Sequence, residues 1–244
     1  MSAALVVGGR RAALEAIRAG RATTVLLARG AKATPGLREL LDIAAARGIA
    51  VTEVDRSELD VLDPDHHGVA ARVHLAETLD ERALSEWPYT EDAVVVVLDG
   101  ITDPQNLGAA ARSAEAAGAA MLVTRTRRAA DVTPAAIRAS AGALLHLPHA
   151  RVANLTRALE RLQGVGFTVV GLDEAADPAA FRQPCPEGRV AVVLGAEGEG
   201  ISRLVRERCD VLVSLPVRGH VSSLNASAAL AAALYAYVLP SRRT

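Results

Sequence analysis

Strand-like and helix-like segments alternate along the chain from Ala93 onward, and this alternation restricts the fold more than any other feature. Short apolar runs rich in valine and leucine predict the strands, and the runs between them have helix-forming composition. The predicted strands are residues 94–98, 121–124, 144–147, 168–172, 190–194 and 211–215. The predicted helices are residues 105–117, 134–141, 152–164, 201–208 and 225–239. This pattern predicts an α/β fold with a mostly parallel sheet covered on both faces, which binds ligands at the carboxyl ends of its strands.

Residues 5–74 have the pattern of a smaller α/β unit. Its predicted helices and strands are residues 10–18, 23–28, 35–47, 51–54 and 69–73. The segment that follows is rich in acidic residues and contains Trp87, Pro88 and Tyr89, which is typical of a linker with a short helix. The predicted organisation is therefore a first domain at 1–74, a linker at 75–92 and a second domain at 93–244.

Composition excludes several classes of protein. The formal net charge of −1 neither favours nor excludes a nucleic-acid partner, so any basic surface must be local. Cys185 and Cys209 stand alone, and the neighbours His66 and His67 would point apart on a strand, so we expect a surface turn there and no metal site. The N-terminus lacks a signal-peptide design, and the longest apolar run, 226–239, is shorter than the roughly 20 residues of a membrane span. These features predict a soluble, cytoplasmic protein.

The first of three informative junctions follows the first predicted strand of the second domain. Asp103 before Pro104 predicts a helix start, because an acid caps well and proline suits the first helical position. Asn106 then lies in the first turn, at the carboxyl edge of the sheet. Arg112 and Glu115 share a helix face, so Arg112 could reach a ligand or could equally well pair with Glu115.

The second junction is rich in glycine and follows an apolar strand that ends near Leu194. Gly195, Gly198 and Gly200 indicate a sharply turning backbone that something approaches closely. The spacing matches neither a Walker A loop nor the GxGxxG fingerprint. Glu197 would repel phosphate, so the junction favours a ligand that is cationic or donates hydrogen bonds.

The third junction links the strand at 211–215 to an alanine-rich helix. Pro216 should end the strand, and Ser222, Ser223 and Asn225 are all suitable N-caps. Each junction leaves the carboxyl end of a strand, so all three can converge on one pocket.

These three junctions together resemble the motifs of the SpoU/TrmH family of S-adenosylmethionine-dependent RNA ribose 2′-O-methyltransferases, in the SPOUT superfamily. The motifs are residues 103–108 with Arg112, residues 195–200, and residues 215–227. Residues 9–10 and 67–73 resemble the L30e-like substrate-binding domain of the bacterial enzymes that methylate a 23S rRNA guanosine in the peptidyl-transferase centre. The resemblance implies a C-terminal trefoil knot, a homodimer, the cofactor S-adenosyl-L-methionine and an RNA substrate, with 23S rRNA favoured.

The resemblance also assigns roles to single residues. Cofactor binding, largely through backbone groups, is implied for Leu194, Gly195, Gly200, Leu215 and Leu224. Catalysis or substrate orientation is implied for Asn106, Arg112, Glu197, Ser223 and Asn225. An arginine side chain stays protonated at neutral pH and is therefore a poor base, so we favour Arg112 as a phosphate clamp that orients the ribose hydroxyl.

Alternative functions remain open at this stage. Within the same reaction class the alternative is a tRNA ribose 2′-O-methyltransferase, although the simplest tRNA members lack an N-terminal domain. From another class, the chain could be a catalytically silent RNA-binding or ribosome-assembly factor, which need not keep all the motif residues. A dehydrogenase is disfavoured because no GxGxxG follows the first strand.

Overall fold

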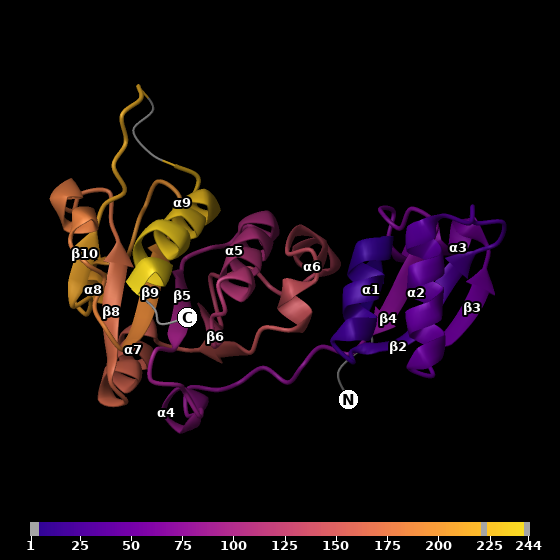
Figure 1. The fold of residues 1–244 in the computed structure, drawn as a ribbon, viewed down its shortest axis with the longest axis horizontal. Coiled ribbons are helices and arrows are strands. Elements are labelled where there is room, and N and C mark those ends of the chain that lie inside the picture. The colour runs from indigo at the N-terminus through magenta and orange to yellow at the C-terminus, as the bar shows by residue number, and fades with distance from the viewer. Residues whose placement is uncertain (1–4, 221–223, 242–244) are drawn as a thin grey trace. The chain divides into compact units, whose positions relative to one another are not determined.

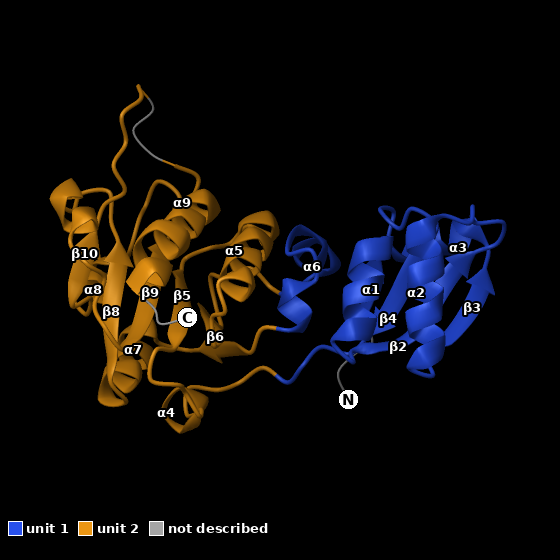
Figure 2. Ribbon diagram, in the orientation of Figure 1, with its two compact units in different colours: residues 1–77, 132–146 blue, residues 78–131, 147–244 orange. Residues whose placement is uncertain are grey.

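The computed structural model describes residues 5–220 and 224–241 of the chain. Contacts divide the chain into two compact units, residues 1–77 with 132–146 and residues 78–131 with 147–244 (Figure 2). The segment 132–146, which the sequence pattern assigns to the second domain, therefore packs with the first unit.

The first unit contains a four-stranded sheet in the order β1-β4-β2-β3. The strands are β1 (Leu5–Gly8), β2 (Ala22–Ala28), β3 (Ala50–Val54) and β4 (Val69–Val73). Strand β4 is antiparallel to both β1 and β2, whereas β2 and β3 are parallel. The carboxyl ends of β1, β2 and β3 consequently share one edge of the sheet with the amino end of β4.

Helices of the first unit begin at this same edge. They are α1 (Arg10–Arg18), α2 (Pro35–Ala46) and α3 (Arg56–Leu62). The unit also contains helix α6 (Pro134–Ala139) and the 3₁₀ turn η1 (Ala143–Leu145), which come from the later segment 132–146. Helix α1 packs on β1, β2 and β4, and α2 packs on α1 and β3. Helix α2 starts at a proline, and the side chain of Thr34 caps it by accepting a hydrogen bond from the Leu37 amide (3.3 Å).

Buried polar groups fix the turn before β4. His66 is 1% exposed, its Nδ1 accepts a hydrogen bond from the Gly68 amide at 2.8 Å, and its Nε2 lies 2.9 Å from the Asp60 carboxylate. Asp63 accepts a hydrogen bond from the Gly8 amide at 2.8 Å and pairs with Arg138 of α6. The expectation of a surface turn holds for the exposed His67 and is wrong for His66, which is a buried structural residue.

The second unit contains a six-stranded sheet in the order β10-β8-β9-β5-β6-β7, and all its paired strands are parallel (Figure 1). The strands are β5 (Val94–Asp99), β6 (Met121–Arg125), β7 (His149–Val152), β8 (Phe167–Leu172), β9 (Arg189–Gly195) and β10 (Val211–Val213). The predicted α/β class with a mostly parallel sheet is confirmed.

Helices cover both faces of this sheet. They are α4 (Ala83–Glu86), α5 (Pro104–Ala116), α7 (Leu155–Gly164), α8 (Arg203–Arg206) and α9 (Ala226–Ala233), with 3₁₀ helices η2 (Pro178–Arg182) and η4 (Leu239–Ser241) and a π-helix η3 (Leu234–Val238). Helix α7 contacts β8, α4 and α8, whereas α9 contacts β8, β9 and α5. Among the described residues, no helix is long and apolar enough to cross a bilayer.

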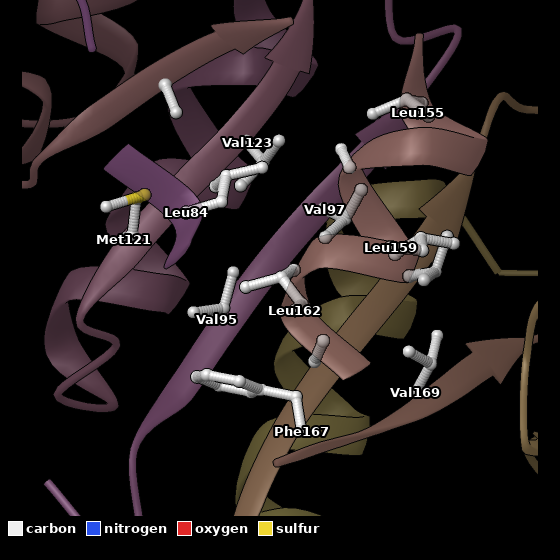
Figure 3. Packing of buried hydrophobic residues seen from close by; sticks show 14 of the residues in the cluster. Leu84, Val95, Val97, Met121, Val123, Leu155, Leu159, Leu162, Phe167 and Val169 are labelled. Atoms are coloured by element: carbon white, nitrogen blue, oxygen red, sulfur yellow. The ribbon is translucent and has the colours of Figure 1, made fainter. Parts of the chain in front are cut away.

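The core beneath α7 is built from alternate residues of the central strands. Val95 and Val97 of β5 lie against Leu159 and Leu162 of α7, and Val169 of β8 extends the same layer (Figure 3). All six residues of β5 are buried. Because consecutive strand residues point to opposite faces, a fully buried strand requires cover on both sides, which the two helix layers supply.

Some predicted elements differ in the structure. The strand expected at 144–147 is wrong, because Gly142 (φ 94°) introduces the 3₁₀ turn η1 and the strand, β7, comes only after Pro148. The helix expected from 152 begins at Leu155, since Val152 belongs to β7 and Asn154 is the cap. The last helix, expected at 225–239, changes from α to π geometry after Ala233. Strand β1 and helix α3 have no counterpart in the sequence prediction.

Candidate functional site

A cavity of about 430 Å³ lies in the second unit at the carboxyl ends of β8, β9 and β10. Leu172, Leu194 and Val213 bring the ends of these three strands into its wall. The remaining wall comes from the glycine-rich loop 195–200 and from residues around the third junction. Parallel α/β sheets bind their ligands at this position, so we treat the cavity as the candidate site. We call it the acidic cavity because of the carboxylates that line it.

The glycine-rich loop closes on itself at the cavity rim. The Gly200 amide donates a hydrogen bond to the Ala196 carbonyl at 2.8 Å, and a Cβ atom at Gly195 would lie 2.0 Å from the Gly200 carbonyl carbon. The close approach that the glycine pattern predicts is therefore made at Gly195 by the chain's own backbone. At Gly198 and Gly200, whose φ angles are 80° and 67°, no atom of the described residues lies within 4 Å of an added Cβ.

The charge of the cavity is one-sided. Its described lining residues include four carboxylates and no lysine or arginine; the carboxylates are Asp173, Glu174, Glu197 and Glu199. Asp173 is neutralised by an ion pair with Arg206. Leu194, Leu215 and Leu224 contribute apolar surface beside these acids. Such a lining suits a ligand that carries positive charge or donates hydrogen bonds next to an apolar portion.

The first and third junctions contact each other through the side-chain amides of Asn106 and Asn225. Asp103 caps α5 by accepting hydrogen bonds from the amides of Gln105 (3.2 Å) and Asn106 (3.3 Å). Asn225 caps α9 in the same way, accepting from the Ser227 amide at 3.1 Å. The Asn225 side-chain amide also donates to Asn106 Oδ1 at 3.1 Å, between the packed helices α5 and α9 (Figure 1). Two motifs that lie 119 positions apart in sequence are thus joined directly.

The structure brings most of the predicted site residues into one region. All five predicted cofactor residues line the acidic cavity together with Glu197; the five are Leu194, Gly195, Gly200, Leu215 and Leu224. Asn106 and Asn225 are joined by their hydrogen bond, and Arg112 is exposed on α5. Arg112 has no ion-pair partner in the described part of the chain, so the alternative pairing with Glu115 is not made. Ser223 lies outside the described residues.

Asp99 is a positioning residue that the sequence analysis did not single out. Its carboxylate is 3% exposed at the end of β5, accepts a hydrogen bond from the Ser202 amide at 2.8 Å and pairs with Arg125 at 2.9 Å. Ser202 follows the glycine-rich loop, so Asp99 ties that loop to the centre of the sheet. The sequence could have indicated this role, because Asp99 is an acidic residue at the last position of an otherwise apolar strand.

Cys209 is a structural thiol. Its Sγ donates a hydrogen bond to the Val205 carbonyl at 3.4 Å. Burial, and secondarily the nearby Asp210 and Asp173 carboxylates, raises the pKa of Cys209 to about 12. A thiol with this pKa stays protonated and unreactive at neutral pH. No group of three or more potential metal ligands occurs among residues 5–220 and 224–241.

The fold and the cavity together define an α/β protein whose second unit has a cavity of small-ligand size at the carboxyl ends of its strands and whose first unit is a separate compact unit. Residues 93–235 match the SpoU rRNA methylase family, and residues 6–79 match the family described as RNA 2′-O ribose methyltransferase substrate binding. The chain belongs to the SpoU rRNA methylase family and is an RNA methyltransferase.

Similar proteins extend over nearly the whole chain. An uncharacterized tRNA/rRNA methyltransferase of Mycolicibacterium vanbaalenii is 44% identical over 92% of this chain and 73% of its own length. A putative TrmH family tRNA/rRNA methyltransferase of Staphylococcus saprophyticus is 36% identical over 95% of this chain and 94% of its own. The SpoU methyltransferase AviRb from Streptomyces viridochromogenes, solved in complex with its cofactor AdoMet, is 32% identical with a TM-score of 0.76, covering 96% of this chain and 88% of AviRb.

Proposed function

We propose that this protein transfers a methyl group from S-adenosyl-L-methionine to the ribose 2′-hydroxyl of a guanosine in the peptidyl-transferase centre of 23S rRNA. The observation that carries the proposal is the acidic cavity, whose described lining has four carboxylates and no basic side chain. A sulfonium cofactor carries positive charge beside a neutral adenosine, and the carboxylates and leucines of this cavity match the two parts. The volume of about 430 Å³ also falls in the usual range for small-ligand cavities, about 300–1,000 Å³.

Named residues would hold the cofactor. The backbone at Gly195 and Leu215 would bind its polar edges, and Leu194 and Leu224 would contact its apolar surface. The carboxylate of Glu197 would attract the positively charged part of the cofactor. Bound there, the cofactor supplies an activated methyl group that a ribose oxygen can attack.

The chain's own residues must orient the ribose hydroxyl and let its proton leave. Arg112 is exposed and has no carboxylate partner among the described residues, so its fork is available for a substrate phosphate. The phosphate held by Arg112 would accept the hydroxyl proton as the carbon–oxygen bond forms and the carbon–sulfur bond breaks. The hydrogen bond between Asn106 and Asn225 would fix the starts of α5 and α9 relative to each other. Ser223 is assigned to the site only by the family resemblance.

Replacing Arg112 tests the clamp. Arg112→Lys keeps the charge and loses bidentate binding, so kcat should fall by about tenfold or more while the affinity for the cofactor is unchanged. Initial rates at saturating cofactor, with cofactor binding measured by calorimetry, separate the two quantities. A variant that methylates at the wild-type rate would show that Arg112 is not the clamp.

Three further features belong to the same proposal. A homodimer is supported by Tyr235, a large side chain on the π-helix η3 that is 52% exposed. Light scattering should then give twice the chain mass of 25.4 kDa. The trefoil knot and the L30e-like character of the first domain follow from the resemblance to the family, and a ribosomal substrate implies action in the cytoplasm.

The preference for rRNA over tRNA is supported by the first unit. Residues 6–79 match the family described as RNA 2′-O ribose methyltransferase substrate binding. The family resemblance implies that the simplest tRNA enzymes lack such a domain. The test is incubation with methyl-labelled cofactor and a mixture of 23S rRNA and tRNA, followed by separation and by mapping of 2′-O-methylation through resistance to alkaline cleavage. Label in a peptidyl-transferase guanosine supports the proposal, and label in tRNA alone replaces the substrate while keeping the reaction. If neither RNA is labelled although the cofactor binds, the methyl acceptor is a different RNA and the proposed target is wrong.

A further inference from the structure

A second cavity, of about 340 Å³, lies wholly within the first unit. It opens at the sheet edge where β1, β2 and β3 end and β4 begins. Its wall includes five residues that carry or can carry positive charge, which are Arg10, Arg29, Lys32, Arg56 and His67. Its described lining residues include no aspartate or glutamate. We name it the basic cavity.

Most of this positive charge is not neutralised. Arg29 pairs with Asp55 at 3.1 Å, and Arg10 donates a hydrogen bond to the Thr34 hydroxyl at 2.7 Å, which leaves its charge uncompensated. Lys32 and Arg56 are exposed, and neither has a carboxylate within 4.0 Å among the described residues. Four permanent cations converging on one hollow of a chain with net charge −1 indicate an anionic ligand.

The backbone adds to this preference. Helices α1 and α2 both begin at the cavity, so the positive ends of their dipoles point toward it. No side chain caps the first turn of α1, which leaves amide donors available there. His67 has a φ of 49°, a strained conformation for a residue other than glycine, and the buried His66 beside it anchors the turn. This turn holds the exposed imidazole of His67 at the cavity wall.

Size identifies the kind of anion. A cavity of about 340 Å³ is larger than a free phosphate needs, and Ala28, Leu37 and Val69, each at most 5% exposed, close it from below. The guanidinium group of Arg10 provides a plane on which a nucleobase can stack. An RNA duplex presents its backbone on a convex surface, whereas a concave site of this size accommodates one nucleotide drawn out of a single strand.

We infer that the basic cavity binds one unstacked nucleotide from a single-stranded part of the RNA substrate, with its phosphate on Lys32 and Arg56. The inference rests on the proposed function in that the ligand is taken to be the RNA substrate. It assigns a site and a mode of recognition to a domain that is otherwise known only by its family.

Binding of the full-length protein to RNA tests the assignment. The probe is a fluorescein-labelled single-stranded oligonucleotide from the peptidyl-transferase loop of 23S rRNA, followed by anisotropy over a range of salt concentrations. Lys32→Ala with Arg56→Ala should weaken binding by about tenfold or more and lower the slope of log K against log salt by about 1 per cation removed. Lys32→Arg should retain wild-type binding because it keeps the charge.

Arg38→Ala is the matched control. Arg38 is an exposed arginine on α2 outside the cavity, so its replacement should leave RNA binding unchanged. All variants should bind S-adenosylhomocysteine with wild-type affinity, which shows that the second unit is intact. Annealing the oligonucleotide to its complement should abolish the difference between the wild type and the double variant. If the difference persists on the duplex, the cavity does not select an unstacked nucleotide and the inference is overturned.

Lys32 also offers a direct probe, because it is the one lysine in the sequence. Its acylation by an N-hydroxysuccinimide ester, followed by mass spectrometry, should slow several-fold when the oligonucleotide is bound and stay unchanged with S-adenosylhomocysteine. Equal acylation rates with and without RNA would overturn the site. If wild-type protein transfers no methyl group and yet RNA protects Lys32, the proposed function is wrong and the RNA site in the basic cavity is supported. If wild-type protein methylates RNA and the double variant has an unchanged KM for RNA, the proposed function is supported and the RNA site is wrong.

Discussion

The two cavities of this protein carry opposite charge. The acidic cavity of the second unit has four carboxylates and no basic residue among its described lining, whereas the basic cavity of the first unit has four permanent cations and no acid. Summed over the chain these charges nearly cancel, which is why the net charge of −1 says nothing about either ligand. Local charge has to be counted within one cavity at a time before it indicates a ligand.

The cavities also differ in how their backbones are built. In the acidic cavity the backbone is crowded, since a Cβ atom at Gly195 would collide with Gly200 and Ile201. In the basic cavity Gly30 has open space around it, and charged side chains form much of the wall. The acidic cavity should therefore be sensitive to small changes of shape, and the basic cavity to changes of charge.

The largest effect should come from Gly195→Ala. The added Cβ would lie 2.0–2.3 Å from backbone atoms of Gly200 and Ile201, so the glycine-rich loop must move. Overpacking of this kind costs about 3 kcal/mol or more, and we expect cofactor affinity to fall by at least about 100-fold. Calorimetric titration with S-adenosylmethionine measures the loss, and RNA binding through the first unit should persist.

Gly164→Ala is the control for this change. Gly164 ends α7, and nothing lies within 4 Å of a Cβ placed there. This variant should bind the cofactor like the wild type and be no less stable, because alanine favours a helix over glycine. Wild-type affinity in Gly195→Ala would contradict the shape-based account of the acidic cavity.

The meeting of the second and third junctions at one cavity could be predicted from the sequence, whereas no residue of the first junction is among the described residues that line it. Parallel strands place their carboxyl ends at one edge, so strand–helix alternation alone brings Gly195 and Leu215 to the same side of the sheet. The cap at Asp103 was likewise evident from the proline that follows it. These inferences need only local patterns and one topological rule.

Other features depend on distances that periodicity does not contain. The hydrogen bond between Asn106 and Asn225 requires α5 and α9 to pack together, and the contact of Asp99 with Ser202 requires β9 to lie beside β5. The basic cavity was missed because Lys32 and Arg56 converge only once the parallel strands β2 and β3 are paired, and Arg10 joins them only once β1 is placed beside β4. The strand expected at 144–147 failed because a short apolar run does not distinguish a strand from a buried turn.

Acid should weaken the second unit through His149. Burial, and secondarily the nearby Arg151, lowers the pKa of His149 from 6.5 to about 4. Between these values the unfolded chain binds a proton that the folded chain refuses, so stability is full above pH 6.5 and declines as the pH falls toward 4. The loss from this group should reach at most about 3 kcal/mol.

Urea unfolding followed by tryptophan fluorescence can assign this loss to one unit, because Trp87 is the one tryptophan and belongs to the second unit. His149→Gln should flatten the pH dependence of the unfolding free energy between pH 4 and 6.5. An unchanged slope in this variant would place the acid-sensitive group elsewhere.

A smaller effect is expected at the buried end of β5. Asp99→Asn removes the charge that balances Arg125 and weakens the hold on Ser202, and should cost about 2 kcal/mol of unfolding free energy, because Arg125 can still reach some solvent. Asp131→Asn is the matched control, since its ion pair with Arg151 (2.8 Å) involves a carboxylate that is 70% exposed. That control should lose less than about 1 kcal/mol. Equal losses would mean that Asp99 contributes no more than a surface charge.

The smallest effect tests the charge argument itself. S-adenosylmethionine and S-adenosylhomocysteine differ by one methyl group and one positive charge, so the ratio of their dissociation constants measures how far the acidic cavity favours a cation. Glu197→Gln should lower the preference for the methylated form by about two- to fivefold, as expected for one partly screened charge, and less at high salt. Glu160→Gln is the control. Glu160 lies on α7 and is not among the residues that line the acidic cavity, so its replacement should leave the ratio of the two dissociation constants unchanged. If Glu197→Gln alters both affinities equally, its carboxylate acts on the shared part of the ligand, and the contrast between the two cavities does not extend to the reactive sulfur.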